Sequence, residues 1–434
     1  MTEFVMDSCS VNEKGHLTLQ GLDTVELAEK YGTPLMLMDE NKIRSTCRIY
    51  KKAITENFGE GSLPLFASKA LSFKGIYKII AEEGLGSDAV SSGELYTMHA
   101  SGFDMAKVVF HGNNKTEGDI RYAIGLGVGR FVVDGKEELE TVDRLAGEAG
   151  IKQKILLRIT PGIDPHTHKS VVTGRVDSKF GNAIATGEAE SITRAALKCQ
   201  NIDLTGFHCH IGSQIFELQP FADAAEVMMG YISDIRDKTG FIAAELNLGG
   251  GFGVRYVKEH PHFDYAKAIA ELAVVVKNSA ERYSLPVPAI MMEPGRSIVA
   301  AAGLTLYTVG SVKEIPDMKN YVSIDGGMTD NPRYALYQSQ YEAVVANRAA
   351  GKADYVCSIA GRCCESGDLI AENIRLCKPA KGDIIAVLVT GAYNYSMASN
   401  YNRIPRPPIV MIRDGEPYIA VKRESLEDLV RNDM

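Results

Sequence analysis

The stretch Leu63-Pro-Leu-Phe-Ala-Ser-Lys69-Ala-Leu-Ser sets the interpretation of the whole chain. A short apolar run ends in one lysine and continues in small and polar residues, which is the pattern of a buried strand that brings a single amine to the mouth of a barrel. Partial desolvation there favours the neutral, nucleophilic amine, which forms Schiff bases with carbonyl groups. The alternative is a lysine that merely extends to solvent.

The same apolar pattern occurs eight times, and most of the runs are separated by segments with helical character, such as Phe73–Glu83, Glu137–Ala149 and Tyr265–Tyr283. Apolar strands that alternate with helices indicate a parallel sheet. Eight such units predict a closed (β/α)8 TIM-like barrel rather than an open Rossmann sheet. The eight runs are Leu63–Ser68, Leu85–Val90, Lys107–Phe110, Arg130–Val133, Lys154–Ile159, Leu204–His210, Glu245–Leu248 and Ala289–Met292.

Each of these predicted strands ends in a polar residue or in glycines that could take part in binding or catalysis. In a (β/α)8 barrel the carboxyl ends of all strands meet at one mouth, where active sites are built. A purely structural sheet would need no such set of polar endings. We expect the long connection Pro161–Asn182 to lie over this mouth. The endings are Lys69, Asp88, His111, Asp134, Arg158, His210, the run Gly249–Gly251 and Glu293.

After Glu293 the pattern changes to alternating β-type runs without helices of useful length between them. The runs are Leu304–Val312, Tyr321–Ile324, Ile384–Thr390, Ile409–Ile412 and Tyr418–Lys422, and Asp414-Gly415 between the last two is a hairpin signal. They predict a mostly antiparallel β-sandwich or β-barrel. We therefore expect a barrel domain at 36–300 and a β domain formed by 1–35 and 301–434, with a possible N-terminal strand at Leu17-Thr-Leu-Gln.

Composition narrows the class of protein. A length of 434 residues favours two domains. A net charge of −8 without a basic block argues against nucleic-acid binding. No apolar run reaches the roughly 20 residues that span a bilayer, and the N-terminus lacks the features of a signal peptide. The eight cysteines form no C-x-x-C pair, so we expect free thiols in a reducing cytoplasm.

Two motifs at strand ends could bind a phosphorylated cofactor. The glycines of Gly249-Gly-Gly-Phe-Gly253 let backbone N–H groups converge on an anion, although a tight loop that needs positive φ explains them equally well. In Glu293-Pro-Gly-Arg296-Ser, the carboxylate could hold a proton on the pyridine nitrogen of pyridoxal phosphate. Arg296 could bind a carboxylate or the phosphate. The alternative is a Glu–Arg ion pair at a turn.

Histidines and cysteines supply further candidates. His208-Cys-His210-Ile-Gly-Ser213 places two histidines on one face of a strand, and Ser213 could donate to a phosphate. Zinc binding together with His166-Thr-His168 would need a further carboxylate or thiol, so we expect no metal and favour a core or ring-stacking histidine. In Cys364-Glu365-Ser-Gly-Asp, the acidic neighbour does not activate the cysteine toward a thiolate, and a protonated thiol suits a proton donor better than a nucleophile. A buried inert cysteine is the alternative.

Two polar, aromatic-rich stretches, Arg333-Tyr-Ala-Leu-Tyr337 and Gly391-Ala-Tyr393-Asn-Tyr-Ser, complete the motifs. Taken together, the motifs resemble those of diaminopimelate decarboxylases, fold-type III pyridoxal-phosphate enzymes of the alanine racemase and ornithine decarboxylase superfamily. The resemblance runs from Gly32 to Lys422. The segment Thr173-Gly-Arg-Val-Asp-Ser-Lys179 also points to this branch.

The chain departs from the family pattern at two places. Phe66 stands where the family often has tyrosine, and Gly361-Arg-Cys363 replaces a lead-in that commonly contains proline. Neither place carries a residue to which the resemblance assigns a chemical role.

The resemblance implies a role for each motif. Lys69 would bind the cofactor covalently, His210 would stack on its ring, and Cys364 would supply a proton. Cys364 and Glu365 would come from the partner subunit of a homodimer with shared active sites. The implied cofactor-binding residues are Lys69, Asp88, His210, Ser213, Gly250, Gly251, Glu293, Gly295, Arg296 and Tyr393. The implied substrate-binding residues are Arg296, Arg333, Tyr337, Glu365 and Tyr393.

The resulting functional hypothesis is decarboxylation of meso-2,6-diaminopimelate to L-lysine and CO2, the last step of lysine biosynthesis, by a cytoplasmic enzyme that binds neither nucleic acid nor membrane. One alternative is a related decarboxylase that acts on ornithine, arginine or carboxynorspermidine. Such an enzyme would bind the distal end of its substrate in an acidic pocket, whereas Arg333 favours a substrate with a distal carboxylate. A second alternative is a non-catalytic homologue, which is disfavoured because Lys69 and Cys364 are both present.

Overall fold

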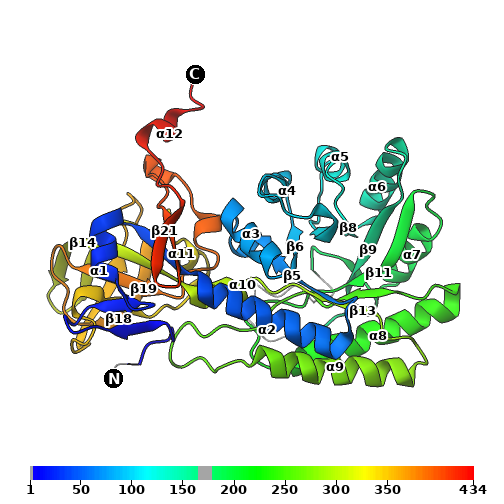
Figure 1. Cartoon of the computed structure of the whole chain (residues 1–434), viewed down its shortest axis with the longest axis horizontal. Coiled ribbons are helices and arrows are strands. Elements are labelled where there is room, and N and C mark those ends of the chain that lie inside the picture. The colour runs from blue at the N-terminus through cyan, green and yellow to red at the C-terminus, as the bar shows by residue number, and fades with distance from the viewer. Residues whose placement is uncertain (1–2, 165–177) are drawn as a thin grey trace. The chain divides into compact units, whose positions relative to one another are not determined.

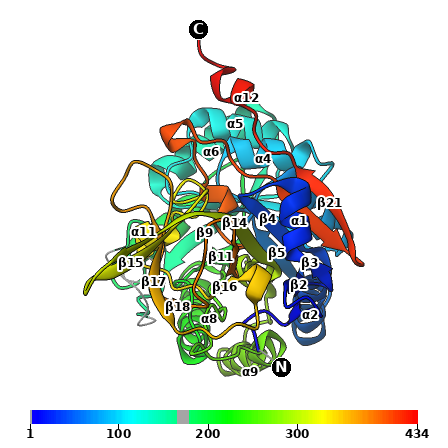
Figure 2. The ribbon, with the colours of Figure 1, turned by 90° about the vertical axis from the view of Figure 1, so that its left-hand side faces the viewer.

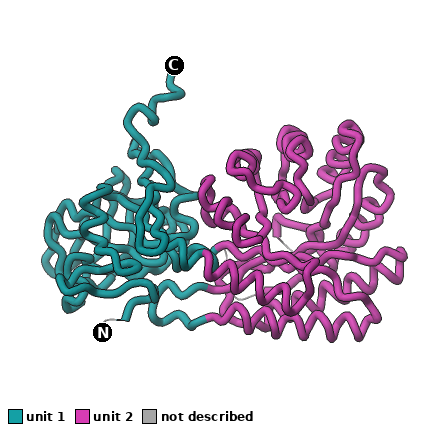
Figure 3. The backbone as a smooth tube through the Cα atoms, in the orientation of Figure 1, with its two compact units in different colours: residues 1–43, 254–262, 296–434 teal, residues 44–253, 263–295 magenta. Residues whose placement is uncertain are grey.

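The computed structural model describes residues 3–164 and 178–434, and the chain forms two compact units (Figure 3). Unit 1 contains Met1–Ile43, Val254–His262 and Arg296–Met434, and unit 2 contains Arg44–Gly253 and Phe263–Gly295. The division differs from the predicted boundaries of 36–300 because β4 (Leu35–Asp39) pairs with β14 (Gly303–Ile315) and β20 (Ile409–Arg413). Strand pairing therefore places an early segment of the chain in unit 1.

Unit 2 is a closed barrel of eight parallel strands, as predicted from the apolar runs (Figure 1). Successive strands pair with one another, and β13 pairs with β5 to close the ring. The strands are β5 (Leu63–Ala67), β6 (Gly86–Ala89), β7 (Val108–Phe110), β8 (Arg130–Val133), β9 (Gln153–Thr160), β11 (Ile202–His208), β12 (Glu245–Asn247) and β13 (Ala289–Met292).

Helices follow the strands and lie outside the barrel (Figure 1). They are α3 (Lys74–Glu82), α4 (Ser92–His99), α5 (Glu117–Gly125), α6 (Lys136–Glu148), α7 (Glu188–Ala196), α8 (Gln219–Thr239) and α9 (Tyr265–Arg282), and α2 (Glu40–Phe58) precedes β5. Local signals set their ends: α5 begins with a capping box formed by Thr116 and Asp119, and α8 ends where Gly240 adopts positive φ. No helix among the described residues is long and apolar enough to cross a membrane.

The interior of the barrel is filled by buried apolar side chains. Leu65, Val109, Val132, Leu156 and Met291 form one cluster that joins five strands. Each such side chain contributes about 1.5–3 kcal/mol by leaving water. At the amino end of the strands, Arg130 donates hydrogen bonds to both carboxylate oxygens of Glu245, which links β8 to β12. The packed interior leaves the opposite end, where the strands finish, to carry the site.

The connection expected to lie over the mouth is described only in part. Residues 165–177, which include His166, His168 and most of the Thr173–Lys179 motif, lie outside the described residues. Beyond them, β10 (Asn182–Ala183) pairs in parallel with the end of β9. Asn182 donates to the carbonyl oxygens of Asp134 and Arg158, so the returning chain is bound to the ends of two barrel strands.

Unit 1 is built on a mostly antiparallel sheet, which confirms the predicted second fold. The long β14 pairs with β15 (Lys319–Ile324), β19 (Ile384–Leu388) and β4, and β20 pairs with β21 (Glu416–Val421). Three strands were not predicted: β16 (Ala343–Val345), β17 (Tyr355–Ala360) and β18 (Leu369–Leu376). Figure 2 faces this sheet, with β14, β15, β17 and β18 side by side.

Smaller elements complete unit 1. The expected N-terminal strand is present as β2 (Leu17–Leu19), but it pairs with β1 (Cys9–Val11) and β3 (Leu22–Asp23) in a separate three-stranded sheet. The helical elements are α1 (Thr24–Tyr31), α10 (Arg296–Val299), α11 (Arg333–Tyr337) and α12 (Leu426–Val430). Two of them, α10 and α11, begin at arginines that the sequence marked as candidates for binding.

Candidate active site

Lys69 lies just beyond β5, in the short 3₁₀ turn Ser68–Ala70. The backbone around it is fixed, because the N–H of Ala67 donates to Pro294 (3.1 Å) and the N–H of Ser68 donates to Asp88 Oδ1 (2.9 Å). The lysine side chain is exposed. The expected partial desolvation is therefore wrong for the described chain, because the turn carries the amine past the end of the strand.

Two carboxyl groups lie near this turn. Asp88, at the end of β6, is buried, and its pKa is raised well above the usual value by burial and by the charge of Glu293, against the opposing charge of Lys69. Burial also raises the pKa of Glu94, whose carboxylate accepts the N–H of Val90 (2.7 Å). Sequence reasoning missed Glu94, because Ser91-Ser-Gly-Glu94 reads as an ordinary helix start, and Ser91 does cap α4.

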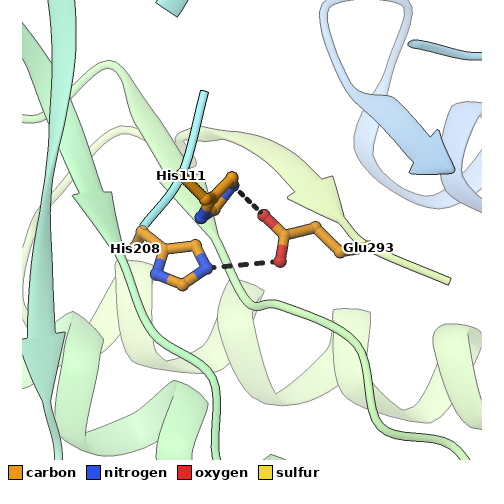
Figure 4. A group of neighbouring side chains, drawn as sticks. All are labelled: His111, His208 and Glu293. Carbon is orange, nitrogen blue, oxygen red and sulfur yellow. Dashed lines mark hydrogen bonds and ion pairs between the residues drawn. The ribbon is translucent and has the colours of Figure 1, made fainter. Parts of the chain in front are cut away.

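Glu293 follows β13 and is the centre of a buried group that we call the glutamate cluster: Glu293, His111, His208 and Asn247. Figure 4 shows Glu293 with the two histidines. Asn247 Nδ2 donates to Glu293 Oε1 (2.7 Å), and His111 Nε2 lies 2.8 Å from the same oxygen. His208 Nε2 lies 3.3 Å from Glu293 Oε2. The rings of His111 and His208 pack edge to face, 4.8 Å apart. Residues from the ends of three other strands thus surround the Glu293 carboxylate.

The electrostatics of the glutamate cluster favour a carboxylate with neutral histidines. Burial alone would raise the pKa of Glu293, but the contacts with His111 and His208 hold this pKa well below the usual value. Burial lowers the pKa of His208 to about 4, and it also lowers the pKa of His111. The three groups offer ligand atoms within 4.8 Å of one another, but they already bond to each other as donors and acceptor.

The pKa values of Asp88 and Glu293 are therefore shifted in opposite directions. Glu293 is held ionised by its donors, whereas Asp88, close to that negative charge, retains its proton to higher pH. Two nearby carboxyl groups with separated pKa values are typical of catalytic sites, where one group must stay charged. Asn247, which supplies one donor, was missed because a lone asparagine in an apolar run carries no distinctive signal.

His210 lies two residues beyond the end of β11 and contacts the glycine loop. The N–H of Gly250 donates to His210 Nδ1 (3.2 Å), so Nδ1 acts as the acceptor of this bond. Burial, followed by the charge of Lys69, holds the pKa of His210 well below its usual value. The ring is therefore neutral at pH 7, as suits an imidazole that packs on another ring.

The loops after β11 and β12 are bound together and pack so closely that some of their glycines have no room for a side chain. Ile215 and Phe252 form a parallel bridge between the loops. A Cβ atom at Gly250 would lie 2.2 Å from the carbonyl oxygen of Glu293, and one at Gly251 would lie 2.3 Å from that of Gly212. Gly295 is similarly crowded, because its Cβ would lie 2.7 Å from that of Ala67. Glycine is therefore required at these positions, and half-buried Ser213 lies in the first loop.

Unit 1 contains a second group of predicted residues, which we call the arginine cluster: Arg296, Arg333, Tyr256, Tyr337 and Tyr393. Both guanidinium groups are buried and lie over the rings of Tyr256 and Tyr393, at 4.8–5.9 Å from the ring centroids. Arg296 Nη1 donates to Tyr256 Oη (2.9 Å), and Arg333 Nη2 donates to Ser339 Oγ (3.1 Å). Arg333 Nε has no hydrogen-bond partner among the described residues.

Tyr256 is the member of the arginine cluster that sequence reasoning missed. It lies in Val254–His262, a segment that leaves the barrel sequence to join unit 1. Its ring also packs edge to face on Tyr341, whose hydroxyl donates to Asn394 Oδ1 (3.2 Å). No local pattern marks a tyrosine that becomes important through a distant segment.

Cys364 and Glu365 lie on an exposed loop of unit 1, so the reading of Cys364 as a buried inert thiol is wrong. Buried Asp368 holds the loop by accepting the N–H groups of Met328 (2.6 Å) and Cys363 (2.7 Å). Within the described residues, no hydrogen bond joins Cys364 or Glu365 to the arginine cluster. The two side chains are presented to the outside on a firmly held loop.

The barrel and its site define a pyridoxal-dependent decarboxylase: residues 40–300 match the family described as "Pyridoxal-dependent decarboxylase, pyridoxal binding domain". The diaminopimelate decarboxylase of Bacillus subtilis (strain 168) is 45% identical over 431 residues, which cover 99% of this chain and 98% of that protein. The chain belongs to the diaminopimelate decarboxylase family.

Solved structures agree in both fold and family. Diaminopimelate decarboxylase from M. jannaschii in complex with L-lysine superposes with a TM-score of 0.92 at 33% identity, covering 100% of this chain and 99% of that one. The enzyme from Helicobacter pylori complexed with L-lysine gives a TM-score of 0.84 at 31% identity and covers 94% and 98% of the two chains. The similarity therefore extends over both units.

Proposed function

We propose that this chain is a pyridoxal-phosphate enzyme that decarboxylates meso-2,6-diaminopimelate to L-lysine and CO2. The observation that carries the proposal is the glutamate cluster. Its buried carboxylate, kept ionised by Asn247 and two imidazoles, lies at the end of β13, beside the strand β5 that precedes Lys69. Relatives named diaminopimelate decarboxylase, two of them solved with L-lysine, support the choice of substrate and product.

The residues at the barrel mouth fit pyridoxal phosphate. The crowded backbone at Gly250, Gly251 and Gly295 provides close-packed loops in which N–H groups can face a phosphate, with Ser213 as a further donor. Lys69 would hold the cofactor by its amine, and Asp88 lies near that amine. Neutral His210 would pack on the ring. When bound, the cofactor withdraws electrons from the carbon that loses CO2, more strongly when its ring nitrogen is protonated.

The individual side chains would then have separate roles in the reaction. Ionised Glu293 would keep a proton on the ring nitrogen, because a negative charge there favours the protonated ring. Arg296 and Arg333, with Tyr337 and Tyr393, would bind the carboxylate of the distal amino acid, so that only the D centre meets the cofactor. The distal ammonium would be bound by Glu365 of the partner subunit.

The proposal includes a homodimer with shared active sites. Cys364 of the partner subunit would return a proton to the carbon from which CO2 leaves. Support comes from the exposure of Cys364 and Glu365 and from the fixed loop that carries them. The eight free cysteines fit a reducing cytoplasm.

The test uses purified protein with added pyridoxal phosphate and measures CO2 release and lysine formation. Meso-diaminopimelate is supplied in one arm, and ornithine, arginine and carboxynorspermidine are supplied in parallel arms. We expect turnover of meso-diaminopimelate alone. Turnover of another substrate only would overturn the assignment of the arginine cluster, and no turnover of any substrate would overturn the enzymatic proposal.

A further inference from the structure

Lys115, in the loop between β7 and α5, is a buried cation that the proposed reaction does not use. Its side chain is 1% exposed. Nζ donates to the carbonyl oxygens of Gly112 (2.9 Å) and Val132 (2.7 Å) and to Glu138 Oε1 (2.6 Å). A lysine ammonium has three N–H donors, so the three acceptors match it completely.

Stability alone does not account for this arrangement. Taking an ammonium and a carboxylate out of water is costly, and well-packed apolar side chains often serve as well as a buried ion pair. Burial lowers the pKa of Lys115, which the charge of Glu138 opposes, and burial raises the pKa of Glu138. Both pKa shifts reflect the cost of keeping the pair charged. The ion pair therefore contributes mainly by fixing the positions of the groups around it.

The ion pair joins three elements at the barrel mouth. Gly112 belongs to the chain that leaves β7, Val132 belongs to β8, and Glu138 lies in the first turn of α6. Glu138 Oε2 also accepts the N–H of Asp134 (3.2 Å), the residue that follows β8. Lys115 and Glu138 therefore bind the ends of β7 and β8 to each other and to α6.

His111 lies between this anchor and the glutamate cluster. Its N–H donates to the carbonyl oxygen of Ala89 (2.7 Å) on one side, and Lys115 holds the next residue, Gly112, on the other. Gly112 has φ of +129°, a conformation that suits glycine, so the chain turns sharply just after His111. The imidazole Nε2 is thereby placed 2.8 Å from Glu293 Oε1.

We propose that Lys115 is a positioning residue that, with Glu138, holds the imidazole of His111 against Glu293. The inference rests on the proposed function in one respect: Glu293 must face the ring nitrogen of the cofactor for the position of His111 to influence the reaction. The charged groups that act on Lys115 are Glu138, Asp134 and Arg158, and those that act on His111 are Glu293, Arg158 and Lys115.

The experiment replaces the cation by an apolar side chain of similar length, Lys115→Met. The control is Lys136→Met, which removes an exposed lysine at the start of α6 that lies 3.8 Å from Glu140. We expect kcat for the proposed substrate to fall by about tenfold, as is usual when partners behind an active-site ligand are lost. KM should not change, because Lys115 contacts none of the residues proposed to bind substrate.

A second readout needs neither cofactor nor substrate. Imidazole ¹⁵N NMR of the ligand-free protein should show that Lys115→Met alters the nitrogen shifts of His111, whereas Lys136→Met leaves them unchanged. Loss of the nearby cation raises the pKa of His111, but movement away from Glu293 removes a charge and a hydrogen bond that raise it, so displacement of the ring is read from the shift of Nε2. Unchanged His111 resonances would overturn the proposal, even if the unmodified protein decarboxylates no substrate and the proposed function fails.

A double variant, Lys115→Met/Glu138→Leu, covers the case in which the single variant does not fold, because it removes both buried charges. We expect it to fold and to keep the low kcat and the altered His111 resonances. If a folded single or double variant matches the control in kcat and in the His111 nitrogen shifts, the ion pair has only a structural role and the proposal is wrong.

Discussion

The barrel mouth and the arginine cluster hold their charges by different means. At the mouth, Glu293 accepts from Asn247 and lies against two imidazoles, so its charge is already satisfied within unit 2. In unit 1, Arg333 lies over tyrosine rings, and its Nε lacks a hydrogen-bond partner among the described residues. This difference agrees with the proposed function, in which the mouth controls the reaction and the arginine cluster binds a carboxylate of the substrate.

The largest expected effect tests the barrel side of this comparison. Lys69→Ala should abolish stable cofactor binding and reduce lysine formation by on the order of 10³ or more, because the proposed function makes this amine the covalent anchor of the cofactor. Absorbance of the bound cofactor and the decarboxylation rate are the measurements. Lys78→Ala, at an exposed position of α3, is the control and should behave as the unmodified protein. Retained activity in Lys69→Ala would remove the barrel mouth from the reaction.

Glu293→Gln removes the charge but keeps the shape of the glutamate cluster. We expect kcat to fall by about a hundredfold, since a fixed charge aimed at a reacting group commonly contributes this much. Cofactor should still bind, which distinguishes this variant from Lys69→Ala when both are followed by absorbance. A kcat equal to that of the unmodified enzyme would show that the ionised state of Glu293 has no role in the reaction.

Two buried groups, one in each unit, should contribute to the pH dependence of stability with opposite signs. The pKa of His208 is lowered to about 4 by burial, so its contribution is present above pH 6.5 and is lost as the pH falls toward 4. In unit 1, burial raises the pKa of Asp330 to about 7, so its contribution is present below pH 4 and is lost as the pH rises toward 7. Each effect amounts to about 3–4 kcal/mol.

Urea unfolding at several pH values, on the unmodified protein and on His208→Gln and Asp330→Asn, measures these contributions. We expect the first variant to lose the decline in the free energy of unfolding on the acidic side. The second should lose the decline between pH 4 and pH 7. If both variants keep the slopes of the unmodified protein, the two buried groups do not change protonation on unfolding.

The smallest expected effect concerns binding in unit 1. Arg333→Ala should raise KM for meso-diaminopimelate by more than about tenfold, the usual cost of a lost charge-assisted hydrogen bond, while the cofactor stays bound. Steady-state kinetics and cofactor absorbance together check this. Arg375→Ala, at an exposed position of β18, is the matched control. Unchanged kinetics in Arg333→Ala would refute the assignment of the arginine cluster to substrate.

The barrel was predictable because each of its strands is a separate apolar run whose polar ending is visible beside it. Glu293 and His111 stood out for this reason, although their contact did not, because nearly two hundred positions separate them. Tyr256 and Asn247 were missed since their importance comes only from residues that folding brings near. Strand β16 was missed because it has only three residues, and β17 and β18 were missed because each interrupts its apolar residues with polar side chains.

The strand β4 has a consequence for the order in which the chain is synthesised. All five of its residues are buried, yet its partners β14 and β20 come from the far end of the polypeptide. At about 5–20 residues per second, the ribosome delivers β14 only some tens of seconds after β4 has emerged. During that interval the barrel sequence can already fold, while an apolar segment at the front of the nascent chain awaits its neighbours. Chaperones that shield this segment during translation would therefore favour the yield of native protein.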